Sequence, residues 1–225
     1  RDSSTSRGLG DVYKRQGWGV EQQITCVDGS TFQIYMANMK SIFMDMIKNT
    51  DMVIFNRCKK EDPLPTYRRG IKVANQRAEV IFEDEEGELG DIFQDEMPFD
   101  MNAPVIEILP EDYGIWFVDA MDHPENYEGK TVKFKARVMK PRGMGSKFFV
   151  PGRTAMTCCA DDTTFLGYVC KSAYAPKLTP GEWVEVTAKV GIEKRNEYQG
   201  EEGIVLDAEH VEQCDPLEDE MVYFN

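Results

Sequence analysis

The first third of the chain alternates short apolar runs with helical patterns. The runs Gln23–Asp28, Met52–Phe55 and Glu79–Phe82 are nearly continuous in apolar residues, which is typical of strands buried on both faces. Apolar residues recur at helical spacing over Thr31–Asn49, and a shorter helix is predicted over Thr66–Ala74. This strand–helix–strand–helix–strand order predicts a parallel sheet covered by helices.

From residue 130 onward the apolar pattern changes to a period of two. Val132, Phe134 and Val138 alternate with charged neighbours, which indicates a strand with one buried face. Strands of this kind are expected over residues 130–138, 147–150 with 155–159, 164–170, 184–192 and 203–211. Five strands with a longer connection at 172–179 predict an OB-type β-barrel. An ordinary antiparallel sandwich is the competing fold.

The two patterns are separated by an acidic stretch of weak periodicity. We therefore expect an α+β protein of two domains: a partial α/β parallel-sheet domain over residues 17–90, an acidic linker over 91–111 and a five-stranded OB-like β-barrel over 112–225. Arg1–Gln16 has no apolar periodicity and resembles translated sequencing-adapter readthrough at the ends of metagenomic reading frames. We exclude it from the fold, and a natural disordered tail is the alternative.

Charge is distributed unevenly along the chain. The formal net charge is −14, which opposes binding to nucleic acid or anionic lipid. From Glu83 to Gly129 there are sixteen acidic and no basic residues, whereas from Lys130 to Ala160 there are eight basic and no acidic residues. Four cations of the basic block are candidates for a barrel face that binds an anion or a protein partner: Lys133, Lys135, Arg137 and Arg153.

Composition predicts a cytoplasmic protein. No apolar run approaches the about 20 residues that a membrane helix needs, so no membrane insertion is expected. No secretory leader is visible, and the six scattered cysteines of a chain this long favour reduced thiols.

Three of these thiols are candidates for a zinc site. Thiolates are soft ligands for zinc, and a hairpin after the Cys158–Cys159 pair would bring Cys170 close, with Asp161 and His210 as further ligands. Neighbouring residues of a flat strand point to opposite faces, so the adjacent pair can share a metal only where the strand bulges or ends. The alternative is that one cysteine lies in the core and the other on the surface.

The stretch ITCVDGSTFQIYMANMKSIFMDMIKNTDMVIFNRC resembles the middle of CobW-type GTPases. In that family, a strand ending in Val-Asp is followed by a helix and by a strand that ends in the guanine-recognition loop. The resemblance places Asn56, Arg57 and Lys59 on the base side of a nucleotide site. It implies GTP and Mg²⁺ as cofactors of the full-length protein and a link to metal homeostasis.

Two features set this sequence apart from a working GTPase. Lys59 stands where the resemblance expects the aspartate that selects guanine, and no G-x-x-x-x-G-K-[ST] phosphate-binding loop occurs in the sequence. We therefore expect a truncated P-loop GTPase-like domain that does not hydrolyse GTP as it stands. The alternative is that Asn56 caps a strand-to-loop turn.

The stretch FFVPGRTAMTCCADDTTFLGYVCK, followed by GEWVEVTAKVG, resembles the C-terminal domain of YcgQ-like bacterial proteins. This resemblance implies a permease or another metal-handling protein as partner. Two functions remain open: an accessory GTPase-family protein of metal homeostasis, or a non-catalytic OB-fold module that binds a metal, an anion or a protein partner.

Overall fold

The computed structural model describes residues 20–90, 97–159 and 162–223 of the chain. Contacts divide the described residues into two compact units. Residues 65–73 and 97–223 form the second unit, and the other described residues form the first. Within the described ranges, no helix combines the length and the apolar character that crossing a bilayer requires.

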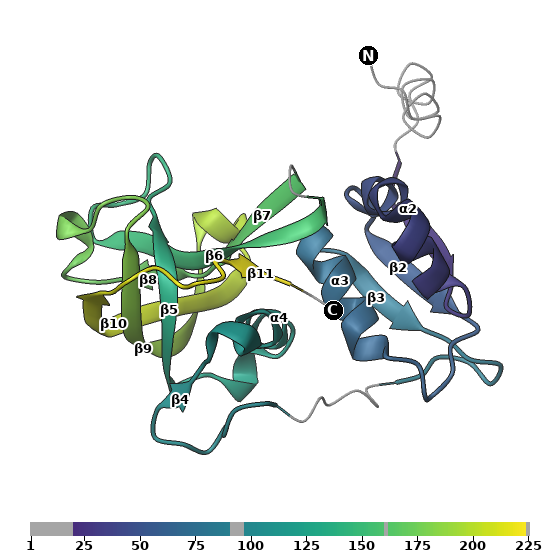
Figure 1. The fold of residues 1–225 in the computed structure, drawn as a ribbon, viewed down its shortest axis with the longest axis horizontal. Helices are drawn as coiled ribbons and strands as arrows, with labels where there is room; N and C mark the ends of the chain where they lie inside the picture. Colours follow the sequence, from purple (N-terminus) through teal and green to yellow (C-terminus); the bar gives the residue numbers. More distant parts are fainter. Residues whose placement is uncertain (1–19, 91–96, 160–161, 224–225) are drawn as a thin grey trace, which may run out of the picture. The chain divides into compact units, whose positions relative to one another are not determined.

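The first unit contains a small parallel sheet. Strands β1 (Ile24–Asp28), β2 (Met52–Asn56) and β3 (Glu79–Phe82) lie in the order β1-β2-β3, and both pairings are parallel (Figure 1). Each strand lies where the apolar runs predicted it, so the three predicted strands and their parallel arrangement are confirmed. Helix α3 (Leu64–Ala74) connects β2 to β3 along the chain, and its residues 65–73 group with the second unit.

Helix α2 (Phe32–Ile47) follows β1 and supplies the apolar cover of this sheet. Its first residue, Phe32, is buried and packs edge-on against Phe55 of β2, with ring centroids 4.9 Å apart. Phe43 of the same helix lies 5.1 Å from the Phe32 ring. The predicted helix over 31–49 is therefore confirmed, with non-helical backbone at Met39. Phe32, Phe43, Met44 and Ile47 are buried, whereas other residues of the apolar pattern, including Tyr35, Met39 and Met46, are exposed.

The second unit is built around a closed five-stranded barrel. Its strands are β5 (Thr131–Met139), β6 (Phe148–Cys159), β8 (Val169–Lys171), β10 (Glu202–Gln213) and β9 (Trp183–Lys194), hydrogen-bonded in that order (Figure 1). Pairing of β5 with β6 closes the sheet on itself. The predicted five-stranded barrel is confirmed, and the competing sandwich of two separate sheets is excluded by this closure.

Shorter elements surround the barrel. Strands β7 (Asp162–Gly167) and β11 (Met221–Val222) both pair with β6, and helix α4 (Tyr113–Asp122) precedes β5. Four 3₁₀ turns complete the unit: η1 (Pro110–Asp112), η2 (Pro124–Asn126), η3 (Ala175–Lys177) and η4 (Asn196–Tyr198).

The expected linker over 91–111 differs from the structure where residues are described. Strand β4 (Ile106–Glu107) pairs in parallel with β5, and Phe99, Ile106 and Ile108 are buried in the barrel core. Residues 91–96 lie outside the described residues. A two-residue strand is too short to show a period, so its apolar residues were hidden within an acidic stretch.

The barrel core joins alternate strand residues to one face of α4. Trp116 is fully buried and lies 4.8 Å from the Phe134 ring of β5. The hydroxyl of Tyr113 donates to the Leu166 carbonyl at 3.0 Å, and that of Tyr168 donates to the Phe117 carbonyl at 2.5 Å. These bonds satisfy buried tyrosine hydroxyls and fix α4 on the barrel.

Strand β6 approaches β7 closely at a point where two glycines meet. Gly152 of β6 pairs directly with Gly167 of β7. A Cβ atom on Gly167 would lie 2.6 Å from the Pro151 carbonyl oxygen and 3.0 Å from the Gly152 Cα. No side chain fits between these backbones, so glycine is required for the close approach of β7 to β6.

Replacing Gly167 with alanine is therefore expected to lower the free energy of unfolding of the barrel by about 1–3 kcal/mol, because the added methyl group overpacks the β6–β7 contact. Urea unfolding followed by near-UV circular dichroism measures this change.

Gly191→Ala in β9 provides the matched control. Its Cβ would meet only the Val205 carbonyl oxygen at 3.7 Å, an ordinary contact. We expect this variant to change stability by less than about 1 kcal/mol. Equal destabilisation by the two substitutions would show that the close approach does not require glycine.

Candidate functional site

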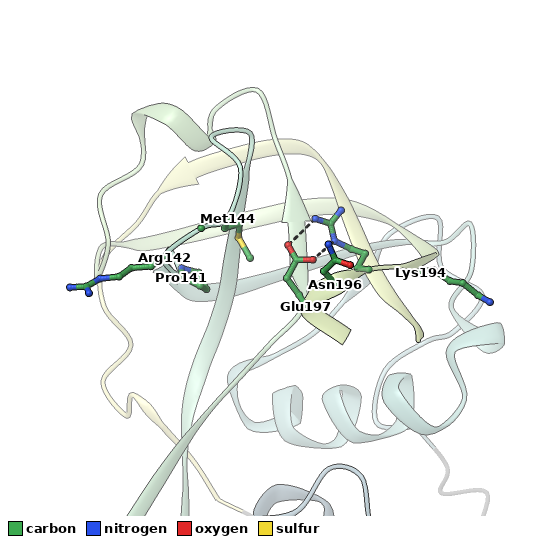
Figure 2. A pocket seen from close by; sticks show the side chains of 8 residues that line it. Pro141, Arg142, Met144, Lys194, Asn196 and Glu197 are labelled. Atoms are coloured by element: carbon green, nitrogen blue, oxygen red, sulfur yellow. Dashed lines mark hydrogen bonds and ion pairs between the residues drawn. The ribbon is translucent and has the colours of Figure 1, made fainter. Parts of the chain in front are cut away.

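Two loops of the barrel enclose an open cleft. One loop, residues 140–147, connects β5 to β6, and the other, residues 195–201, connects β9 to β10. The cleft has a volume of about 520 Å³. Figure 2 shows the eight residues that line it: Pro141, Arg142, Gly143, Met144, Lys194, Arg195, Asn196 and Glu197.

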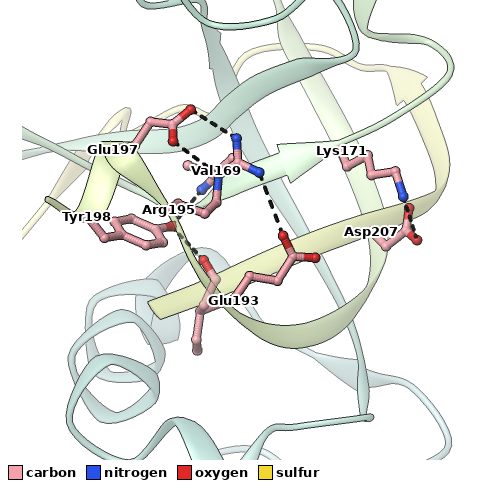
Figure 3. Close-up of polar contacts among 8 residues, drawn as sticks. Val169, Lys171, Glu193, Arg195, Glu197, Tyr198 and Asp207 are labelled. Atoms are coloured by element: carbon pink, nitrogen blue, oxygen red, sulfur yellow. Dashed lines mark hydrogen bonds and ion pairs between the residues drawn. The ribbon is translucent and has the colours of Figure 1, made fainter. Parts of the chain in front are cut away.

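A tyrosine draws the 195–201 loop over the barrel wall. The Tyr198 hydroxyl donates to the Ile204 carbonyl of β10 at 2.5 Å and accepts from the Val169 N–H of β8 at 3.1 Å (Figure 3). The Tyr198 ring also covers Gly203, where a Cβ would lie 2.6 Å from a ring carbon. Because β8 pairs with the start of β6, this position brings the loop beside the strand that follows loop 140–147.

Arg195 forms the rigid wall of the cleft. Its guanidinium lies over the Phe148 ring, 4.3 Å from the centroid. It also makes two hydrogen bonds of 3.0 and 3.2 Å to Glu197 (Figure 3). A second carboxylate, that of Glu193, lies 3.7 Å away. The hydrogen bond to Arg195 lowers the pKa of Glu197, and the same bond raises the pKa of Arg195.

The facing loop is anchored at its start. The Lys140 ammonium donates to the carbonyls of Ala175 and Leu178 at 2.5 and 2.6 Å. Beyond it, Gly143 has a φ of +87°, which a residue with a side chain rarely adopts. Figure 2 shows Met144 beside the cleft centre and Arg142 pointing away from it. Loop 140–147 is therefore anchored at Lys140, and it contains a glycine in the left-handed conformation at residue 143.

The predicted basic row on β5 is matched by acids within the barrel. Lys133 lies 3.1 Å from Glu185 of β9, which raises the pKa of Lys133, and Lys135 pairs directly opposite Glu185 in the strand register. Arg137 donates to the Gly181 carbonyl at 3.1 Å and lies 4.0 Å from Glu220. The row is outward-facing, and part of its charge is compensated by neighbours in the same chain.

Arg153 does not share a face with these cations. It is only 2% exposed, and its guanidinium donates to the carbonyls of Pro110, Asp219 and Met221. It also lies over the Tyr113 ring, 5.6 Å from the centroid, and burial lowers its pKa. The side chain ties strand β11 to the barrel, so the expectation of a surface role for Arg153 was wrong; alternation alone did not reveal the segment that covers it.

The predicted thiol cluster falls mostly outside the described residues. Asp161 and the side chains of Cys158 and Cys159 lie outside them, although the backbone shows a register shift between Met156 and Cys159. Cys170 is fully buried, and desolvation raises the pKa of its thiol. The described part of the chain contains no group of three or more metal-ligating side chains, and its four described thiols are free. The zinc site stays a prediction.

The three residues predicted on the base side lie at the carboxyl end of β2. Arg57 has a φ of +55°, and its guanidinium pairs with Asp28 of β1 at 2.8 Å. The side-chain oxygen of Asn56 is buried without a hydrogen-bond partner, whereas Lys59 is exposed. The Gly29 N–H donates to the Asn56 carbonyl at 2.8 Å, which brings the two strand-end loops together.

Apart from Arg142, which belongs to the basic block, the cleft residues were missed in the sequence. Arg195, Asn196 and Glu197 carry no motif, and Met144 lies between glycines in a basic loop. A signal was present in the barrel prediction, because the loop after the first strand and the loop before the last are the ligand-binding loops of OB barrels. Inspection of the residues in these two loops, 140–147 and 195–201, would have pointed to both sides of the cleft.

The fold defines a barrel domain with a loop-lined cleft. Residues 88–224 match the family described as DUF1980 C-terminal domain, so the chain belongs to this family. No curated protein sequence matches the chain.

Solved structures with partial likeness include the mitochondrial single-stranded DNA-binding protein Rim1 of S. cerevisiae, with 10% identity, a TM-score of 0.24, and coverage of 39% of this chain and 97% of that one. Aspartyl tRNA synthetase of Entamoeba histolytica has 16% identity and a TM-score of 0.26, and the match covers 42% of this chain and 21% of the synthetase. With TM-scores this low, neither likeness bears on fold or function.

Replacing Arg195 with glutamine is expected to return the pKa of Glu197 upward toward its ordinary value of 4.5, because the lowering depends first on the Arg195 hydrogen bond. Carbon-detected NMR titration of the Glu197 carboxyl measures this shift. Because the folded-state pKa is depressed, the stabilisation by the pair is present above the unfolded pKa and is lost as pH falls through the folded one.

Arg142→Gln is the control, since it removes a guanidinium from the opposite loop. An unchanged Glu197 midpoint in Arg195→Gln, or an equal shift in both variants, would contradict the assigned ion pair.

Proposed function

We propose that this chain is a non-catalytic binding protein whose OB-like barrel holds its ligand in the cleft between loops 140–147 and 195–201. The observation that carries the proposal is the location of the cleft between the two loops that flank the first and last strands of the barrel. OB-type barrels present their ligand-binding surface at these loops.

The chemistry of the lining supports binding rather than catalysis. The eight lining residues include no serine, cysteine or histidine, so no Ser–His or Cys–His pair meets there. The lining instead supplies cations, a carboxamide and a thioether, which are groups that orient a polar ligand. The wall formed by Arg195 is already ordered by Glu197 and Phe148, which lowers the entropic cost of binding.

The location of the site can be tested without knowing the natural ligand. We expect acetate, methyl phosphate and N-methylacetamide, titrated into the full chain, to shift backbone NMR signals chiefly of residues 142–144 and 194–197. Asn196→Trp, which fills the cleft with a large ring, should reduce these shifts.

Asn126→Trp makes the same change at an exposed position of η2 and should leave the shifts intact. Shifts scattered over the barrel, or equally affected by both variants, would overturn the location of the site.

A second candidate function concerns the first unit. Its parallel sheet places Asp28 and Asn56 at the carboxyl ends of adjacent strands, where ligands bind in open α/β sheets. The Asn56 oxygen beside these strand ends is buried without a hydrogen-bond partner, and such an unsatisfied acceptor is the observation that favours a nucleotide-related role. On this view, and on the resemblance to CobW-type GTPases, the intact protein would use GTP and Mg²⁺ in metal homeostasis, with a permease or metal-handling protein as partner.

This chain is expected not to bind GTP or ATP at micromolar concentrations, because its sequence contains no G-x-x-x-x-G-K-[ST] loop and Arg57 is engaged with Asp28. Titration with fluorescent GTP and ATP analogues measures this. Micromolar affinity, abolished by Asn56→Ala and kept in Asn126→Ala, would show that a phosphate site forms from another stretch.

A further inference from the structure

One wall of the cleft, loop 140–147, lies in a locally positive part of the chain, whereas residues 193–202 on the other side carry four glutamates beside Lys194 and Arg195. Loop 140–147 contains Lys140, Arg142 and Lys147, and no acidic residue occurs from Lys130 to Ala160. The protein as a whole has a formal net charge of −14. A positive loop on an acidic protein attracts negatively charged ligands to this position while the remaining surface repels them.

Two of the three cations that line the cleft are available to a ligand. Arg195 is engaged with Glu197 and Glu193 and is only 15% exposed in its side chain. Among the residues that the structure describes, neither Arg142 nor Lys194 has an acidic partner within ion-pair distance, and both are exposed. The lining cations outside ion-pair distance of an acid are therefore Arg142 and Lys194, and Lys194 lies opposite Glu202 in the β9–β10 register.

These two cations lie at opposite rims. Figure 2 shows Arg142 and Lys194 pointing away from the cleft centre in opposite directions. A compact anion at the centre would therefore not contact both side chains. An extended ligand that crosses the cleft, with negative groups toward each end, matches this arrangement of charge.

The centre of the cleft suits a polypeptide backbone. The Asn196 side chain provides one acceptor and two donors, which is complementary to the C=O and N–H of a peptide group. Met144 faces it from the other loop, and methionine adapts to varied side chains because its thioether is flexible and polarizable.

We propose that the cleft binds an extended acidic segment of a partner protein, with its backbone at Asn196 and its carboxylates at Arg142 and Lys194. This inference rests on the proposed function and specifies the class of ligand for the same cleft. Single-stranded nucleic acid, the other extended polyanion, is disfavoured because its binding relies on exposed aromatic side chains. Phe149, Tyr168 and Trp183 are buried, and Phe148 lies beneath the Arg195 guanidinium.

The test is fluorescence anisotropy of the full chain with a labelled ten-residue peptide of alternating Glu and Gly. We expect saturable binding that weakens as NaCl rises from about 50 to about 500 mM, since rim charges are screened. Arg142→Glu combined with Lys194→Glu should raise the Kd at least about tenfold, because like charges then face each other.

Lys177→Glu combined with Lys189→Glu makes the same change in net charge at exposed barrel positions outside the cleft, and should change the Kd less than about threefold. An equal loss in this control, or equal binding of a Gln-Gly peptide, would overturn the inference. Tighter binding of a ten-nucleotide oligo-dT would overturn it in favour of nucleic acid. Absence of peptide binding, with fragment shifts still confined to the cleft, would reject the acidic ligand and leave the binding site standing.

Discussion

The pairings of the second unit converge on strand β6, and Gly152 lies where its pairings with β5 and β7 meet. Strand β6 pairs with β8 at its start, with β5 through Val150–Gly152, and with β7 and β11 beyond that point. At Gly152 and Gly167, the backbones of β6 and β7 approach so closely that no side chain fits between them. The pairing with β5 closes the sheet, and Gly152 lies opposite Arg137 of β5 and opposite Gly167 of β7 in the strand register.

Closure of the barrel also decides where the loops lie. Strand β8 lies between β6 and β10, and the loop before β10 passes over β8. The Tyr198 hydroxyl of this loop forms hydrogen bonds with β8 and with β10. The Arg195 side chain then lies over Phe148 at the start of β6. The cleft is thus a consequence of strand order, and its rigid wall is fixed by one tyrosine and one arginine.

Electrostatics divides the basic residues of this acidic chain into two groups. Some are neutralised within the barrel, as Lys133 is by Glu185 and Arg195 is by Glu197, or are buried, as Arg153 is. Exposed ion pairs of this kind contribute little to stability and mainly set local geometry. The unpaired cations Arg142 and Lys194 have no such task in the fold, which makes them the informative charges of the site.

The sequence by itself determined the kinds of element and their order along the chain. Continuous apolar runs predicted β1, β2 and β3, and strict alternation predicted β5 and β9, because these patterns record which faces of a strand are buried. The tertiary structure alone decided which strands pair, that β4 joins the barrel, that Arg153 is covered by β11, and that two distant loops form a cleft. The physical reason is that periodicity reports the burial of a residue within its own element, whereas pairing and loop proximity depend on contacts between residues far apart in the sequence.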